Sequence, residues 1–190
     1  MRNLIVCNFM SLDGFYAGPG DDVMALPFDP MFDEYNAERV RTADTLLLGA
    51  ASYPQMMAFW PPKVQDPNAS PVEQEIGRFQ RDSRKVVISD SLTEADVAEH
   101  PATIVPRSKG ADFVRALKEE DGKDILVFAS HRMWNPLLHL GLVDEVHLMV
   151  GCAAVGHGTP VFTGPTPRMR LLEVRTYDGF DNPVLRYACT

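Results

Sequence analysis

The chain has 190 residues, of which 45% are hydrophobic and 23% charged, and its formal net charge is −8. This composition is typical of one globular domain with a substantial core. The negative charge argues against a general nucleic-acid-binding protein, because affinity for phosphate backbones comes from clustered lysine and arginine. No apolar run approaches the roughly 18 residues of a membrane span, and no signal-peptide pattern opens the chain. With three cysteines and no CxxC pair, we expect reduced thiols and a cytoplasmic protein.

Predicted strands and helices alternate through the first half of the chain. A β-rich strand over residues 3–9 is broken by Ser11-Leu12-Asp13-Gly14. Gly18-Pro19-Gly20 extends the break into a loop of the kind that often covers a ligand. The other elements predicted in this half are a helix over 29–43 that begins with an Asp-Pro pair, a strand over 45–48, helices over 52–59 and 72–81, and a strand over 85–88.

The second half centres on a buried strand over residues 125–128 that runs through a tight turn into a short helix. The strand is a continuous apolar run, as expected when both of its faces are covered. Apolar residues then recur at helical spacing from Trp134 to Leu138, and Gly141 stops the helix. The remaining predicted elements are a strand over 103–105, an amphipathic helix over 109–120, a strand over 146–150, and two antiparallel strands over 171–177 and 183–188. The alternation predicts an α/β layered domain with a mixed, mainly parallel sheet and antiparallel C-terminal strands.

The turn after residue 128 is the predicted position of any chemistry. At a helix N-terminus, backbone N–H groups without partners point outward and bind phosphate. Ser130, His131 and Arg132 open this helix, so Ser130 is expected to act as an N-cap, as a phosphate ligand, or as both. No HExxH motif or Cys/His cluster is present, and His131, His139 and His147 lack metal-ligand spacing, so we expect no metal site.

Six segments occur in an order and spacing that are similar to those of a known family: SLDGF, LLGAASYPQM, KVVISDSL, ILVFAS, LLHLGLVDEVHL and GHGTPVF. Together they resemble the dihydrofolate-reductase-like family that includes the C-terminal reductase domain of the bifunctional riboflavin-biosynthesis deaminase/reductase. The resemblance covers nearly the whole chain as a single domain. It implies a dihydrofolate-reductase-like three-layer fold, NADPH as the hydride donor, and a homodimer.

The resemblance also implies which residues bind the cofactor and the substrate. The cofactor-binding residues would be Gly49, Ala50, Ser52, Ser89, Ser91, Phe128, Ala129, Ser130, His131 and Arg132. The substrate would lie against Asn8 and Gly14, beside Asp13. Asp13 either positions or protonates the substrate, or is a turn residue bonded to its own backbone. Asp33 and Glu34 lie where such an enzyme often places its acid, although solvated helix charges are the simpler interpretation.

Two positions depart from the family's usual pattern. The family usually has LLGR, whereas Ala50 follows Gly49 here, so a guanidinium able to bind phosphate in a bidentate fashion is absent. Ala129 stands where the family usually has glycine, and its Cβ disfavours a positive φ and the close approach of a diphosphate. Other cations that can supply charge are Arg84, Lys85, Arg107 and Arg132.

The sequence therefore predicts an NADPH-dependent reductase of a small heterocyclic or carbonyl-type molecule. The family suggests a 5-amino-6-(5-phosphoribosylamino)uracil-type pyrimidine as one such substrate. Two alternatives follow from Ala50 and Ala129. One is a non-catalytic small-molecule-binding protein that has lost NADPH, and the other is a reductase that prefers NADH. We expect neither nucleic acid nor a membrane as a partner.

Overall fold

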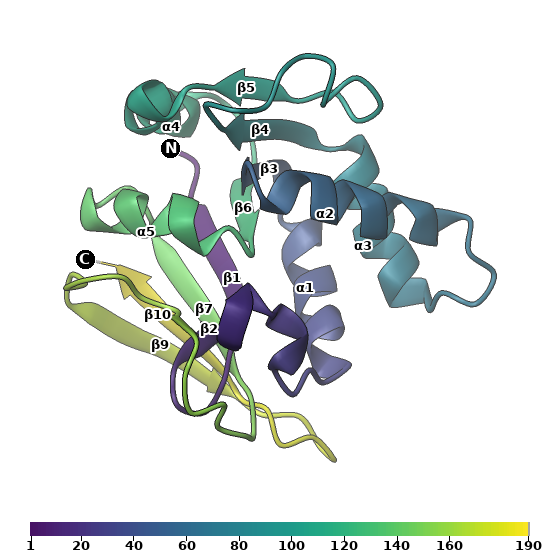
Figure 1. Cartoon of the computed structure of the whole chain (residues 1–190), viewed down its shortest axis with the longest axis vertical. Coiled ribbons are helices and arrows are strands. Elements are labelled where there is room, and N and C mark those ends of the chain that lie inside the picture. Colours follow the sequence, from purple (N-terminus) through teal and green to yellow (C-terminus); the bar gives the residue numbers. More distant parts are fainter. Residues whose placement is uncertain (190) are drawn as a thin grey trace.

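The computed structural model describes residues 1–189, and its centre is an eight-stranded sheet (Figure 1). The strand order is β5-β4-β3-β6-β1-β7-β10-β9. The strands are β1 Leu4–Met10, β3 Ala43–Gly49, β4 Arg84–Ile88, β5 Thr103–Val105, β6 Asp124–Phe128, β7 Glu145–Val150, β9 Met169–Arg175 and β10 Val184–Cys189. β1 and β3 to β7 run parallel, whereas β10 is antiparallel to β7 and β9. The prediction of a mixed, mainly parallel sheet with antiparallel C-terminal strands is confirmed.

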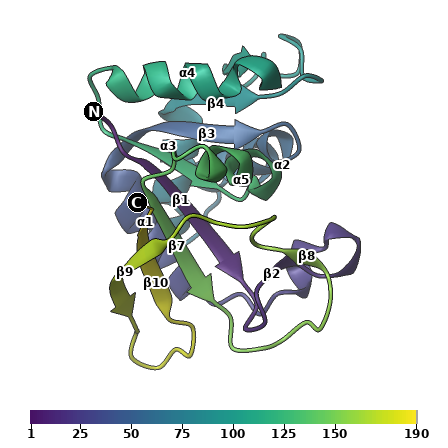
Figure 2. The same ribbon diagram turned by 90° about the vertical axis from the view of Figure 1, so that its left-hand side faces the viewer.

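Helices cover both faces of this sheet, which gives three layers (Figures 1 and 2). α4 and α5 pack on one face, α1 and α2 pack on the other, and α3 lies against α1. The helices are α1 Met31–Arg41, α2 Ser52–Phe59, α3 Pro71–Asp82, α4 Arg107–Glu119 and α5 His131–His139, with short 3₁₀ helices η1 Pro19–Asp21, η2 Val23–Ala25 and η3 Pro61–Val64. A separate small sheet pairs β2 Phe15–Ala17 with β8 Thr159–Pro160.

The apolar runs of the central strands reflect this double covering. Val127 of β6 belongs to the core cluster that contains Trp134 of α5. Its neighbours Leu126 and Phe128 belong to the opposite cluster, which contains Tyr35 of α1. Burying one such aliphatic or aromatic side chain contributes about 1.5–3 kcal/mol. The two clusters therefore hold β6 rigidly just before the turn that leads into α5.

Local sequence signals set the helix ends. In α3, Ser70 Oγ accepts the N–H of Glu73 at 3.1 Å, and the Glu73 carboxylate accepts the N–H of Ser70 at 2.8 Å. This is a capping box, which stabilises the first turn. α1 begins at Met31, slightly after its predicted start, with the Asp29 carboxylate accepting the Met31 N–H at 2.9 Å.

The carboxyl ends of β1, β3, β4 and β6 lie along one edge of the sheet, because these strands are parallel and adjacent. The segments that follow them are 11–26, 50–51, 89–102 and 129–130. In open parallel sheets, ligands bind in the crevice at this edge. Within residues 1–189, no helix combines the length and the apolar character that crossing a bilayer requires.

Candidate functional site

The turn between β6 and α5 has an unusual backbone. Ala129 and Ser130 both adopt left-handed conformations, with φ of 53° and 57°. For a residue with a Cβ this conformation costs about 1–2 kcal/mol. Ala129 therefore adopts the left-handed backbone conformation that glycine would favour, although it carries a Cβ. Strain of this kind persists only where surrounding contacts hold it in place, and it is common at ligand sites.

Ser130 supplies the contacts that hold the turn. Its hydroxyl oxygen accepts the N–H of Gly49 at 3.1 Å, and its own N–H donates to Ser52 Oγ at 3.1 Å. The side chain makes no capping hydrogen bond to α5, so the prediction that Ser130 caps its own helix is wrong. Its hydroxyl is committed instead to the end of β3. Gly49 allows this close approach, because a Cβ there would lie 3.1 Å from the Cβ of Met133.

The hydrogen bond to Ser52 joins the N-termini of α2 and α5, and the one from Gly49 joins the start of α5 to the end of β3. The first N–H groups of a helix have no intrahelical partner, and the helix dipole adds partial positive charge there. The two helices therefore present amides to the same space. Corners where helix N-termini meet are places where proteins can hold phosphate groups.

A groove of about 380 Å³ opens from this corner, and we call it the polar groove. Six of the predicted cofactor-binding residues line it: Gly49, Ala50, Ser52, Ser130, His131 and Arg132. Residues that the sequence did not single out also line it, among them Tyr16, Asp21 and Met133. The groove thus brings residues after β3 and residues after β6 together, while their role in cofactor binding stays a prediction.

Two of the four candidate cations face the polar groove. Arg107 begins α4 and lines the groove, with its side chain largely exposed and its Nε 3.7 Å from Asp90 Oδ2. Arg132 lines it as well and forms an ion pair with Asp21, with 2.5 Å between Nη2 and Oδ2. The other two are committed elsewhere: Arg84 pairs with Glu120, and Lys85 Nζ donates to backbone carbonyls of α3 and its C-cap.

Ser89 and Ser91 do not line this groove. The Ser89 hydroxyl accepts the N–H groups of Ser91 and Leu92 at 3.0 and 2.9 Å, which is a local turn after β4. The structure does not bring these two hydroxyls to the other predicted cofactor contacts. The local hydrogen bonds explain their position after β4.

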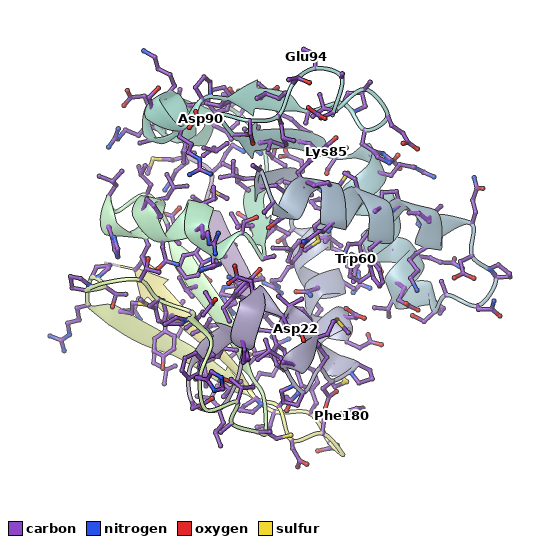
Figure 3. The ribbon with its side chains drawn as sticks, in the orientation of Figure 1. Asp22, Trp60, Lys85, Asp90, Glu94 and Phe180 are labelled. Carbon is purple, nitrogen blue, oxygen red and sulfur yellow. The ribbon has the colours of Figure 1, made fainter. Side chains whose placement is uncertain are left out.

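A second hollow adjoins the groove, and we call it the aromatic cavity. It has a volume of about 150 Å³ and is walled by Phe9, Phe28, Phe32 and Trp60, the last of which is labelled in Figure 3 after the end of α2. The predicted residues that line it are Asn8, Phe128 and Ala129. Phe128 and Ala129, predicted as cofactor contacts, thus face the cavity and not the polar groove.

Tyr16 lies where the two hollows meet. It lines both of them, as do Val23 and Gln55, and its ring stacks on His131 with 4.5 Å between centroids. Burial, with a smaller contribution from the Asp21 charge, raises the pKa of Tyr16 to about 12. The phenol therefore stays protonated near neutral pH and can donate a hydrogen bond. Burial also lowers the pKa of His131, which favours the neutral imidazole.

Asp13 and Gly14 line neither hollow. The Asp13 carboxylate accepts from Ser11 Oγ at 2.6 Å and from the N–H groups of Gly156 and Val155 at 2.8 and 3.1 Å. The Ser11 hydrogen bond contributes most to lowering the pKa of Asp13. This geometry suits a residue that ties two loops together. A catalytic role for Asp13 stays a prediction, and a carboxyl with a lowered pKa is a weak proton donor near neutral pH.

The acids of α1 also lie outside both hollows. Burial raises the pKa of Asp33 to about 6, whereas Glu34 is exposed. Among residues 1–189, no group of three or more His, Cys, Asp or Glu side chains gathers in a way that would hold a metal ion. Tyr16, Arg107 and Arg132 are side chains of the polar groove that can donate hydrogen bonds to a ligand.

Sequence comparison gives a family match over residues 2–179, to the family described as the RibD C-terminal domain. A curated relative, the "Uncharacterized protein YyaP" of Bacillus subtilis (strain 168), is 29% identical over 175 residues. That match covers 92% of this chain and 88% of the relative.

Solved structures with the same fold include three proteins of riboflavin biosynthesis. A putative riboflavin biosynthesis protein from Shewanella sp. PV-4 superposes with a TM-score of 0.70 at 16% identity, covering 100% of this chain and 99% of that one. The deaminase/5-amino-6-(5-phosphoribosylamino)uracil reductase of Thermotoga maritima gives 0.66 at 15%, with 100% and 57% covered. The riboflavin biosynthesis reductase Rib7 of Saccharomyces cerevisiae gives 0.60 at 17%, with 100% and 90% covered. These likenesses confirm the predicted dihydrofolate-reductase-like fold.

Proposed function

The chain belongs to the RibD C-terminal domain family, and we propose that it is an NADPH-dependent reductase of a small heterocyclic or carbonyl-type molecule. One observation carries the proposal: the polar groove, which starts at two joined helix N-termini, meets the aromatic cavity at Tyr16. The diphosphate of a dinucleotide needs backbone amides like those of the polar groove, and a ring that accepts a hydride suits the apolar walls of the aromatic cavity.

The residues of the polar groove fit a phosphorylated dinucleotide. The amides that open α2 and α5 would hold the diphosphate, and Ser130 fixes their mutual position. Arg107 and Arg132 would supply positive charge that Ala50 does not provide. NADPH, when bound, supplies the hydride that the reaction requires.

The chain's own residues would orient the reactants and exclude water. The aromatic walls of the cavity keep solvent away from the reacting ring. Among the described residues, Tyr16 is the one ionisable side chain that lines both hollows, and its phenol holds a proton at their shared wall. It would hydrogen-bond to the substrate atom that gains negative charge during reduction.

Titration with NADPH and with NADH tests the proposal directly. We expect saturable NADPH binding in the micromolar to sub-millimolar range, as is usual for substrates and cofactors of enzymes. Arg107→Gln should weaken NADPH binding, whereas Arg84→Gln, which alters an arginine that does not line the groove, should not. Absence of saturable binding by either nucleotide up to millimolar concentration would contradict the reductase proposal.

The alternative functions make different predictions in the same assay. Ala50 favours a reductase that prefers NADH, because an arginine at this position would bind a 2′-phosphate. Equal or tighter binding of NADH would support that alternative. Binding of neither nucleotide, together with binding of a small molecule in the aromatic cavity, would support a non-catalytic binding protein.

A homodimer formed through the sheet edge is part of the proposal. β9 is one of the two edge strands of the large sheet, and Leu172 and Val174 on one of its faces are 37% and 55% exposed. Exposed apolar residues on an edge strand are suited to pairing with another chain. A second copy of this chain would cover them.

A further inference from the structure

The polar groove holds one carboxylate among its amide and cationic groups. Among the described residues, Asp21 is the only Asp or Glu side chain that lines the groove. The helix N-termini and the two arginines of the same groove favour anions. A carboxylate placed among them repels an anionic ligand, so its position calls for a physical explanation.

Two hydrogen bonds fix the Asp21 carboxylate in the groove. Arg132 Nη2 donates to Oδ2 at 2.5 Å, and the hydroxyl of Thr159 donates to Oδ1. Thr159 belongs to β8, so a segment far along the chain helps to hold this carboxylate beside the start of α5. The Thr159 hydrogen bond, followed by the charge of Arg132, lowers the pKa of Asp21, and the group is therefore ionised near neutral pH.

The backbone of Asp21 is held in a conformation that matches this placement. Its φ is 62°, in the left-handed region. Few residues with a Cβ adopt this region, although Asp and Asn do so more readily than most. Strain of this kind persists where surrounding contacts hold it in place. The left-handed turn, Thr159 and Arg132 thus keep one charged group at one position in the groove.

The ion pair occupies part of what a phosphate needs from Arg132. A guanidinium binds phosphate most strongly through two parallel N–H···O bonds. Asp21 is bonded to Nη2 and so takes one of the two guanidinium edges that can form such a pair. A phosphate on the remaining edge would lie near the Asp21 carboxylate and be repelled by it. Arg132 therefore binds a phosphate at full strength only when Asp21 gives up its contact.

From these observations we propose that Asp21 is an internal competitor for the guanidinium of Arg132, which an anionic ligand of the polar groove displaces. The contact is autoinhibitory, because it keeps Arg132 paired before the ligand binds and lowers the affinity of the groove for phosphate groups. This inference rests on the proposed function in one respect, since it takes an anion to be the ligand of the groove.

Inorganic pyrophosphate is the probe, titrated by calorimetry into the full chain without nucleotide. Asp21→Asn removes the charge, keeps an acceptor for Thr159 and suits the left-handed backbone. Asp22→Asn is the matched control. Asp22, labelled in Figure 3, does not line the groove, and its carboxylate accepts the N–H of Met24 at 2.9 Å. Both variants change the net charge equally, so a difference between them reports the contact with Arg132.

We expect Asp21→Asn to tighten pyrophosphate binding about three- to fivefold, near the upper limit for an exposed ion pair. Asp22→Asn should leave the affinity unchanged. Asp21→Gly, which also suits a positive φ, gives an independent repeat. In an Arg132→Gln background, the gain from Asp21→Asn should fall below about twofold, because the two side chains act as one contact.

Four results would overturn the proposal. They are unchanged or weaker pyrophosphate binding by Asp21→Asn, an equal gain from Asp22→Asn, a full gain in the Arg132→Gln background, and no pyrophosphate binding by any of these proteins at millimolar concentration. A merely structural role of Asp21 predicts the first of these, because loosening the groove would weaken binding.

The same titrations with NADPH separate the inference from the proposed function. A gain for pyrophosphate that requires Arg132, together with no NADPH binding by any variant, would leave the internal competitor standing and refute the reductase. Saturable NADPH binding with no effect of Asp21→Asn on either ligand would do the reverse.

Discussion

Replacing Ser130 with alanine is the sharpest perturbation of the corner that joins α2 and α5. Ser130→Ala removes the acceptor of the Gly49 N–H but keeps a Cβ, so the left-handed backbone is no more strained than before. Ser130 is only 5% exposed, so water cannot easily replace the lost hydroxyl. A buried donor left without a partner costs about 1–3 kcal/mol.

For a chain of this length, 1 kcal/mol corresponds to about 2–4 °C in Tm. Ser130→Ala should therefore lower Tm by about 4–8 °C for a loss near 2 kcal/mol, measured by urea and thermal unfolding. NADPH affinity should fall as well, because the N-terminus of α5 loses the hydrogen bond that holds it to the end of β3, just before α2 begins. Ser91→Ala, at an exposed hydroxyl outside the groove, is the matched control and should change neither quantity. Wild-type stability of Ser130→Ala would refute the view that this hydroxyl holds the corner together.

Three further expectations concern charge, cofactor choice and assembly. Burial raises the pKa of Asp33 to about 6, so ionisation of this carboxyl lowers the stability of the folded chain as pH rises from about 3.8 through 6. Asp33→Asn should therefore be about 1–2 kcal/mol more stable than wild type at pH 7 and no more stable below pH 3.8. Equal unfolding curves of the two proteins at pH 7 would contradict this expectation. Ala50→Arg should raise the preference for NADPH over NADH by about tenfold or more, since a charge-assisted hydrogen bond contributes about 1.5–3 kcal/mol. An unchanged ratio of the two Kd values would show that position 50 does not face the 2′-phosphate. Val174→Asp should convert a dimer into a monomer in sedimentation measurements, whereas a wild-type chain that is already monomeric would contradict dimerisation through β9.

The layered fold and the turn between β6 and α5 could be predicted from the sequence because they depend on local patterns. The apolar run that ends at Phe128, followed by helical spacing around Trp134, predicts both β6 and the helix that starts after it. The sequence also marked Ala129 as a poor match to a glycine turn. The structure shows that the left-handed backbone is retained, because contacts from the chain around Gly49 and Ser52 compensate for its cost.

Other parts of the site depend on contacts between residues far apart in the chain. Asn8, Asn36 and Gln80 carry no shared motif, and only the packing of β1, α1 and α3 brings them to one cavity. Asp13 looked like a candidate acid, but besides the hydroxyl of Ser11 its carboxylate accepts N–H groups more than 140 residues away, at Val155 and Gly156. Tyr16 directly follows the SLDGF segment, yet nothing in its neighbours indicates that it stacks on His131.

The most direct test of the account is a crystal structure of the chain grown with NADPH. We expect the diphosphate within hydrogen-bonding distance of the backbone amides that open α5 at His131 and Arg132, with the nicotinamide beside Tyr16. Density for the nucleotide anywhere other than this corner, or an empty corner at millimolar NADPH, would contradict the central claim that the joined helix N-termini form a dinucleotide site.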